Sequence, residues 1–182
     1  MPSLVGSEMC IRDRSFMIKN IPYRIVGGTN FYQRKEVKDI LSYLKVVDNG
    51  LDDLAVRRII NVPRRGIGAA TIEKINVYAV EHNISFLDAC FSADSIDTLG
   101  NAKKKINGFA DLIREFRRKM QEGSLEELFK YITDETGYIA NLKAEETEEA
   151  EGRIENINEL LNKVVTYEQE AEEASPVSYT HL

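Results

Sequence analysis

Apolar residues recur at every third or fourth position through most of this 182-residue chain. This is the spacing of the buried face of an α-helix, and it is clearest over residues 102–121 and 150–170. Residues that interrupt helices are few, with 11 glycines and 4 prolines in the whole sequence. The pattern therefore predicts a mainly α fold, a bundle of six or seven helices.

Breaks in the periodicity divide the chain into its expected elements. Pro22 forces an extended backbone, and residues 23–26 read as one short N-terminal β-strand that ends at Gly27-Gly28. Ser124 with Glu127 three residues later has the form of a capping box, and Thr136-Gly137 interrupts the helix that follows. We expect helices over residues 31–47, 52–62, 70–81, 85–90, 102–121, from 125 onward and 150–170, with a loop over 92–101.

The two ends of the chain do not share this pattern. Residues 1–14 and 175–182 show neither helical nor strand periodicity, and both strings resemble translated adapter or vector sequence. We expect a non-native leader over 1–14 and a non-native tail over 175–182, and we leave both out of the fold argument. Disordered native termini are the alternative interpretation.

Composition excludes several classes of protein. Hydrophobic residues make up 43% of the chain, which is too many for a disordered protein, and no apolar run reaches the roughly 18 residues of a membrane span. The two cysteines lie far apart and there are only two histidines, so a disulfide framework or a multi-histidine metal site is not expected. A reducing, cytoplasmic location follows by default.

The net charge of −6 conceals two regions of opposite sign. Residues 145–173 hold eleven Glu against Arg153 and Lys163, a net charge of −9. Residues 57–74 carry four arginines and Lys74 against Glu73, a net charge of +4. Two further basic clusters, Lys103–Lys105 and Arg117–Lys119, are expected to be solvated helix faces. The acidic total therefore does not argue against nucleic acid as a ligand.

The most informative local motif lies between two of the predicted helices, over residues 61–75. A helix ends at Pro63, a Gly-Ile-Gly turn follows, and a second helix begins at once, which is the pattern of a helix-hairpin-helix DNA-binding element. The free N–H groups at the start of a helix attract phosphate, and such a site reads the backbone rather than the bases. The candidate contacts to duplex DNA are Arg64, Arg65, Gly66, Ile67, Gly68, Thr71 and Lys74. A plain tight turn between packed helices is the alternative.

Three blocks of the sequence together resemble the UvrD/PcrA/Rep group of superfamily I DNA helicases. They cover residues 21–39 with Gly-Gly-Thr-Asn-Phe-Tyr-Gln-Arg, residues 60–68 with Pro-Arg-Arg-Gly-Ile-Gly, and residues 153–160 with Arg-Ile-Glu-Asn. The resemblance implies that 15–30 is the edge of helicase domain 2A and that 31–174 is a helical 2B-like subdomain. It also implies a parent protein that is an ATP-driven 3′-to-5′ DNA helicase, with the hairpin on the duplex and with Thr29, Phe31 and Arg34 near the single strand.

The chain departs from that family in lacking a phosphate-loop motif, an acidic magnesium pair and an arginine-finger block. We therefore expect a helicase fragment with no catalytic residues, metal or cofactor of its own, because ATP and magnesium would bind elsewhere in the parent. The implied partners are DNA, the remaining helicase domains and repair or replication proteins at the nucleoid, with no membrane. The alternative is a helical protein-interaction module, in which the acidic last helix or the Lys103–Lys105 helix docks a partner without DNA binding.

Overall fold

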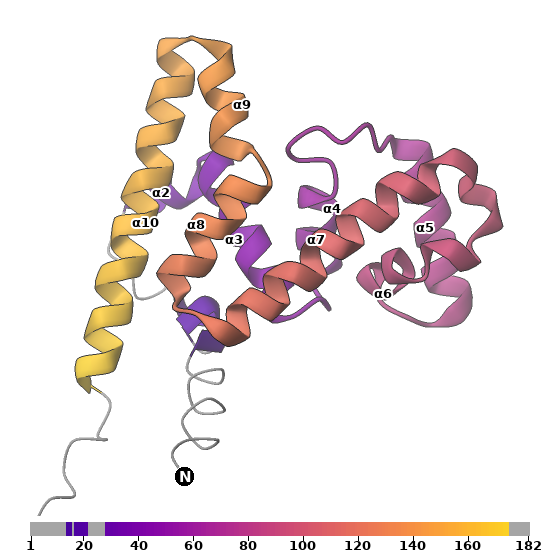
Figure 1. Ribbon diagram of the computed structural model, residues 1–182, viewed down its shortest axis with the longest axis horizontal. Coiled ribbons are helices and arrows are strands. Elements are labelled where there is room, and N and C mark those ends of the chain that lie inside the picture. The colour runs from indigo at the N-terminus through magenta and orange to yellow at the C-terminus, as the bar shows by residue number, and fades with distance from the viewer. Residues whose placement is uncertain (1–13, 16, 22–27, 175–182) are drawn as a thin grey trace, which may run out of the picture.

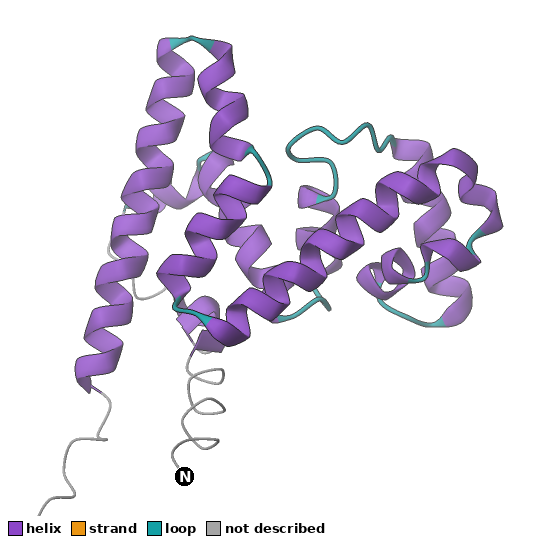
Figure 2. Cartoon of the chain, in the orientation of Figure 1, coloured by secondary structure: helices purple, strands orange, loops and turns teal. Residues whose placement is uncertain are grey.

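The computed structural model describes residues 14–15, 17–21 and 28–174 (Figure 1). Residues 14–15 and 17–21 are helical, and nine α-helices and two short 3₁₀ helices follow within residues 28–174 (Figure 2). The α-helices are α2 (Thr29–Gln33), α3 (Lys35–Asp48), α4 (Asp53–Ile59), α5 (Ala69–His82), α6 (Phe86–Phe91), α7 (Lys103–Glu122), α8 (Leu125–Glu135), α9 (Tyr138–Glu145) and α10 (Glu148–Ala174). The 3₁₀ helices are η1 (Ala93–Ser95) and η2 (Asp97–Ala102).

The mainly α prediction is confirmed, whereas the single β-strand is not borne out. The expected strand at 23–26 lies outside the described residues, and those that are described contain no strand. The predicted loop over 92–101 is also wrong in detail, since most of it is wound into η1 and η2.

Two breaks explain why the described helices outnumber the six or seven predicted. Arg34 has an extended backbone with ψ 138°, so the helix predicted over 31–47 is divided into α2 and α3. Gly137 has φ +69°, a left-handed conformation that suits glycine, and it separates α8 from α9 at the predicted interruption. In both cases one residue with a non-helical backbone interrupts a helix whose apolar spacing is otherwise continuous.

The helices form two groups that α7 connects. Helices α8, α9 and α10 pack on one another at one end of the molecule, α5 and α6 lie at the other, and α4 lies between them beside α3 (Figure 1). The 20-residue α7 runs between these groups, and α3 packs against α4, α7, α8 and α10. Helices α5 and α6 therefore lie at the end of the molecule away from the acidic helix α10 (Figure 1).

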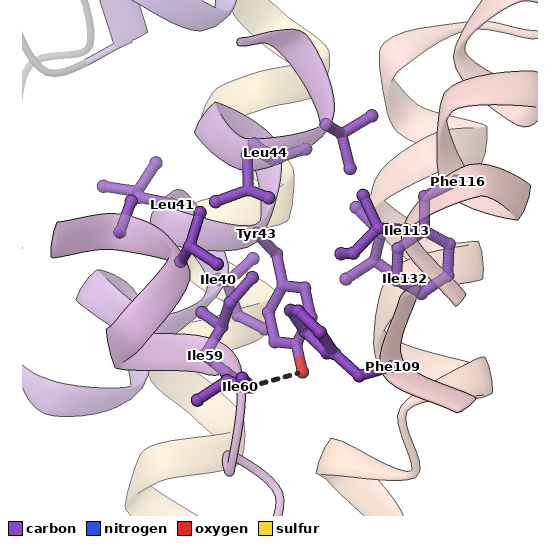
Figure 3. Close-up of a cluster of buried hydrophobic side chains, with 14 of the residues drawn as sticks. Ile40, Leu41, Tyr43, Leu44, Ile59, Ile60, Phe109, Ile113, Phe116 and Ile132 are labelled. Atoms are coloured by element: carbon purple, nitrogen blue, oxygen red, sulfur yellow. Dashed lines mark hydrogen bonds between the residues drawn. The ribbon is translucent and has the colours of Figure 1, made fainter. Parts of the chain in front are cut away.

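The core is built from the apolar stripes that the sequence pattern predicts. On α7 the predicted face is fully buried at Ile106, Phe109, Ile113 and Phe116. Phe109, Ile113 and Phe116 lie on the side of Tyr43 of α3 that faces α7, as Figure 3 shows, and the Tyr43 and Phe116 rings meet edge to face at 6.2 Å between centroids. The Tyr43 ring is thus fixed in the core, where its hydroxyl reaches the segment that follows α4.

Side-chain caps fix the start of α8. The predicted capping box is confirmed, with Ser124 Oγ accepting from the Glu127 N–H and the Glu127 carboxylate accepting from the Ser124 N–H. The Glu168 carboxylate of α10 also accepts hydrogen bonds from the N–H groups of Leu125 at 2.7 Å and Glu126 at 3.2 Å. The Glu168 carboxylate thus attaches α10 to the N-terminus of α8, where the helix dipole favours a negative charge.

Candidate nucleic-acid interface

A tight loop joins α4 to α5, and the Asn61 side chain shapes it. Asn61 Oδ1 accepts hydrogen bonds from the backbone N–H of Arg65 at 2.8 Å and from that of Ile67 at 3.1 Å. Between them Gly66 adopts φ +70°, and Ile67 is 2% exposed. Ile67, the apolar residue between the two glycines, therefore plugs the turn into the core.

Arg65 points into the protein rather than outward beside Arg64. Its Nη1 donates to the carbonyl oxygens of Ile59 at 2.8 Å and Ile60 at 3.1 Å, which are the last carbonyls of α4. Its Nη2 donates to the Tyr43 hydroxyl at 2.6 Å, and the guanidinium lies 5.5 Å from the Phe109 ring centroid. The Arg65 side chain thus ties the C-terminal end of α4 to the core.

The Tyr43 hydroxyl completes this arrangement by donating a hydrogen bond to the Val62 carbonyl. Burial raises the pKa of Tyr43, and the neighbouring Arg65 partly offsets this rise. The phenol therefore keeps its proton and stays a donor at neutral pH. Neither Asn61 nor Tyr43 is among the predicted site residues, although an Asn directly after a helix is a common signal for a turn.

The outer surface of the loop is formed by Arg64, Gly66 and Gly68, all of which are exposed. The Arg64 side chain makes no ion pair or hydrogen bond with the described residues. Gly68 precedes α5 with φ −86°, which any residue adopts, and a Cβ built on it meets nothing within 4 Å. Only Gly66, of the two predicted glycines, is thus required by the backbone.

The other two predicted duplex contacts lie on the first turns of α5. Thr71 is half-buried, and its N–H is used within the helix, since it donates to the Gly68 carbonyl at 3.1 Å. Lys74 is exposed, and its Nζ donates to the Thr98 carbonyl at 2.8 Å. The structure therefore groups Arg64, Gly66, Gly68 and Lys74 on the surface, whereas Arg65 and Ile67 support them from within.

The second predicted site, near the single strand, is mostly occupied by internal contacts. Phe31 is 6% exposed and packs edge to face on Tyr32, with Arg34 and Lys163 over its ring at 5.5 and 5.4 Å. Arg34 also donates to Asn156 Oδ1. The side chain of Thr29 lies outside the described residues. Phe31 is thus a core residue here, with no open ring face for a base.

Asn156 joins two of the sequence blocks that are far apart in the chain. Besides accepting from Arg34, it donates from Nδ2 to the buried Glu36 carboxylate at 2.6 Å. Arg153, one turn earlier on α10, pairs with Glu149 at 2.5 Å. The Arg-Ile-Glu-Asn block is therefore an attachment point between α10 and the start of α3.

Among the described residues, no group of three or more His, Cys, Asp or Glu side chains is placed to hold a metal ion. The buried Cys90 thiol has its pKa raised to about 12, mainly by burial and also by the charge of Asp53. It is therefore a protonated core residue rather than a nucleophile. No described helix is both long and apolar enough to cross a membrane.

Comparison with known proteins agrees with this architecture. The family model for the UvrD-like helicase C-terminal domain matches residues 11–179. The chain is 37% identical over 176 residues to the ATP-dependent DNA helicase PcrA of Staphylococcus aureus strain Mu50, and 40% identical over 174 residues to that of Bacillus subtilis strain 168. In both cases 96% of the chain is covered but only 24% of the relative. The chain spans about a quarter of these relatives, and it belongs to the UvrD-like helicase C-terminal domain family.

Proposed function

We propose that this chain is the duplex-binding part of an ATP-dependent 3′-to-5′ DNA helicase, and that it holds the DNA backbone through the loop between α4 and α5. The observation that carries the proposal is the outward-facing Arg64, exposed and without a partner among the described residues, on a loop that Asn61 and Arg65 hold from behind. A cation on a rigid support beside a helix N-terminus suits a phosphate.

The contact is independent of base sequence. Arg64 and Lys74 offer charge and the loop offers backbone, and these groups recognise phosphates rather than base edges. Few contacts of this kind give weak affinity, and each contact that releases a counterion makes the slope of log K against log salt concentration steeper by about 0.9. The binding role in the parent is to position the duplex while the motor domains move the strand.

The test is fluorescence anisotropy with a labelled duplex between about 20 and 150 mM salt, where phosphate contacts are still measurable. The chain is compared with Arg64→Gln and with Lys45→Gln, which removes an exposed, unpartnered charge near the far end of α3. We expect Arg64→Gln to weaken binding and to reduce the salt slope by about 0.9, with two unrelated duplexes behaving alike. No binding at the lowest salt, or equal effects of the two variants, would favour the protein-interaction module instead.

The motor activity belongs to the parent rather than to this chain. In the proposed parent, ATP and magnesium are bound by domains that lie outside the part that residues 16–174 resemble. Those remaining helicase domains are the first partners of this chain. A coupled ATPase assay with DNA present is expected to give no hydrolysis by the purified chain. Repair or replication proteins are the further partners that we expect for the parent at the nucleoid.

A further inference from the structure

A groove with a volume of about 580 Å³ lies between helix α9 and the loop that joins α4 to α5. Pro63 and Arg64 line it from the loop, and Asn141 and Leu142 line it from α9, which faces that loop in Figure 1. Lys35, the first residue of α3, also lines the groove. Arg64, which the proposed function places on a duplex phosphate, therefore belongs to this groove as well as to the outer surface of the loop.

Two cationic side chains of the groove have no partner. Lys35 and Arg64 are both exposed, and neither side chain makes an ion pair or a hydrogen bond with the described residues. As the first residue of α3, Lys35 carries a positive charge where the helix dipole disfavours one, so this lysine does not serve the stability of the helix. Two free cations thus line one concave surface, where they are available to an anionic ligand.

The carboxylates of the groove are already engaged. The Glu36 side chain is 5% exposed, and it accepts a hydrogen bond from Asn156 Nδ2 at 2.6 Å. The Glu145 carboxylate lies 3.9 Å from the guanidinium group of Arg153, which also lines the groove. The lining therefore holds three cations against two carboxylates, and the excess positive charge falls on the two side chains that have no partner.

The excess of positive charge ends at Lys35. A second hollow, with a volume of about 560 Å³, shares Lys35 and Glu36 with the groove. Its lining adds Glu149 and Glu155, and it holds as many carboxylates as cations. An extended anion is therefore favoured between Arg64 and Lys35, and it is not favoured beyond Lys35.

The uncharged part of the lining fits the sugar and the base of a nucleotide. The Asn141 side chain is exposed and makes no hydrogen bond with the described residues. Its carboxamide both donates and accepts, so it can bind an edge of any base. Pro63 and Leu142 add apolar surface. The volume of the groove lies in the range that encloses a small organic ligand, so it admits a single strand and not a double helix.

We infer that the groove binds a short single-stranded segment that continues from the duplex held by Arg64, with a phosphate of this segment on Lys35. The inference rests on the proposed function and adds a second form of DNA to it. A strand that leaves the duplex carries its phosphates directly from Arg64 into the groove. An acidic peptide would also find two free cations there, but it would compete with the duplex for Arg64, whereas a continuous strand would not.

The experiment compares a blunt duplex with the same duplex carrying an oligothymidine tail at its 3′ or its 5′ end. Fluorescence anisotropy measures the affinity of the whole chain for each DNA at several salt concentrations. Lys35→Gln is matched with Lys45→Gln, which removes an exposed, unpartnered charge near the other end of the same helix. Asn141→Ala and Arg64→Gln complete the set, and far-ultraviolet circular dichroism checks that each variant is folded.

We expect a tail to tighten binding by the whole chain and Lys35→Gln to remove most of this gain. The same variant is expected to reduce the salt slope for the tailed duplex by about 0.7, the value for one phosphate of a single strand, and to leave the blunt duplex unchanged. Asn141→Ala is expected to lower the affinity for the tailed duplex alone. Lys45→Gln is expected to change neither affinity.

The results that would overturn the inference differ from those that test the proposed function. No gain from either tail, or equal effects of Lys35→Gln and Lys45→Gln, would overturn the inference, while Arg64→Gln still tests the hairpin contact on the blunt duplex. A loss in Lys35→Gln confined to the tailed duplex, with no effect of Arg64→Gln, would support the groove and contradict the hairpin contact. Tighter Lys35-dependent binding of an oligoglutamate peptide than of the tail would overturn the choice of DNA and favour an acidic protein segment.

Discussion

The Tyr138 hydroxyl donates a 2.7 Å hydrogen bond to Oδ2 of Asp39, a residue 99 positions earlier in the chain. Asp39 is 1% exposed, and its other oxygen accepts from Arg58 Nε at 2.8 Å. A single buried carboxylate thus joins α9, α3 and α4. The relationship links α9 to α4, the element that leads into the loop proposed to bind DNA.

Replacing Tyr138 by Phe removes one donor from this buried carboxylate. Because a hydrogen bond to a charged group contributes about 1.5–3 kcal/mol, we expect the free energy of unfolding to fall by that amount. Urea denaturation followed by circular dichroism measures the change. Tyr78→Phe is the matched control, since the Tyr78 ring stacks on His82 while its hydroxyl makes no bond to the described residues. Equal losses from both variants would contradict the role given to the Tyr138 hydroxyl.

The same tyrosine predicts how stability responds to alkaline pH. Burial, and then the hydrogen bond to Asp39, raise the pKa of Tyr138 above its ordinary value of 10.0. Below pH 10 the folded and unfolded states both keep the proton, and this contribution to stability is complete. Above pH 10 the unfolded chain loses the proton first, so the free energy of unfolding falls as pH rises.

Urea unfolding between pH 8 and pH 11 tests this dependence. Tyr43, whose pKa burial also raises, contributes a loss in the same direction. We therefore expect Tyr138→Phe to flatten the alkaline decline in part and not to abolish it. A decline of unchanged steepness in this variant would show that Tyr138 does not retain its proton as described.

The two glycines of the hairpin give opposite expectations. Gly66→Ala forces a side chain into φ +70°, and the new Cβ would lie 3.0 Å from Lys105 Nζ. We expect a loss of about 1–2 kcal/mol of stability from the left-handed conformation. Gly68→Ala, at φ −86° and with open space around it, is expected to leave stability unchanged.

Thermal unfolding of the two variants separates these cases, and the duplex titration adds a second comparison. Because the proposed contact brings DNA close to the backbone at Gly68, Gly68→Ala is expected to weaken duplex binding without changing stability. Normal binding by Gly68→Ala would mean that DNA does not approach the backbone at this position.

Substitutions of Asn61 separate the effect of loop conformation on duplex affinity from the effect of charge. Asn61→Ala removes the acceptor for the N–H groups of Arg65 and Ile67 and, like the loss of a helix cap, is expected to cost about 1 kcal/mol. Asn61→Asp keeps that acceptor and adds a negative charge near Arg64. We expect Asn61→Asp to retain its melting temperature and to lose duplex affinity at low salt, which anisotropy and thermal unfolding measure together. Retained affinity in Asn61→Asp would place the phosphate away from the loop.

The first turn of α7 predicts a stabilising substitution. Lys104→Glu replaces a charge that the helix dipole repels with one that it favours, so we expect a gain of about 0.3–1 kcal/mol in the free energy of unfolding. Calorimetry measures the change, and a loss of stability in this variant would contradict the helix-dipole argument.

Sequence periodicity predicted most of the fold because the helices follow local rules. The buried face of α7 and the capping box at Ser124 depend on residues within one or two turns, and both are confirmed. The break at Arg34 was missed. Its side chain binds Asn156, 122 residues away, so no local pattern marks it.

The candidate site divides in the same way. The position of the turn, the burial of Ile67 and the exposure of Arg64 follow from the local sequence. The direction of Arg65 does not, because it depends on Tyr43 and Phe109, which reach the loop only in the folded chain. The sequence does not distinguish Arg64 from Arg65, because only tertiary contacts determine that Arg65 points inward while Arg64 is exposed.

The separation of charge along the molecule bears on how it would approach a polyanion such as the proposed duplex. The acidic helix α10 lies at one end, and α5 with the start of α7, which carries Lys103–Lys105, lies at the other (Figure 1). Such a distribution is a permanent electric dipole, and the field of a polyanion exerts a torque on it. The proposed ligand would therefore turn the domain during its approach, with the end formed by α5 and the start of α7 leading, before any contact forms. This orientation fades once salt shortens the Debye length to about 8 Å, so at physiological salt it acts only over the last part of the encounter.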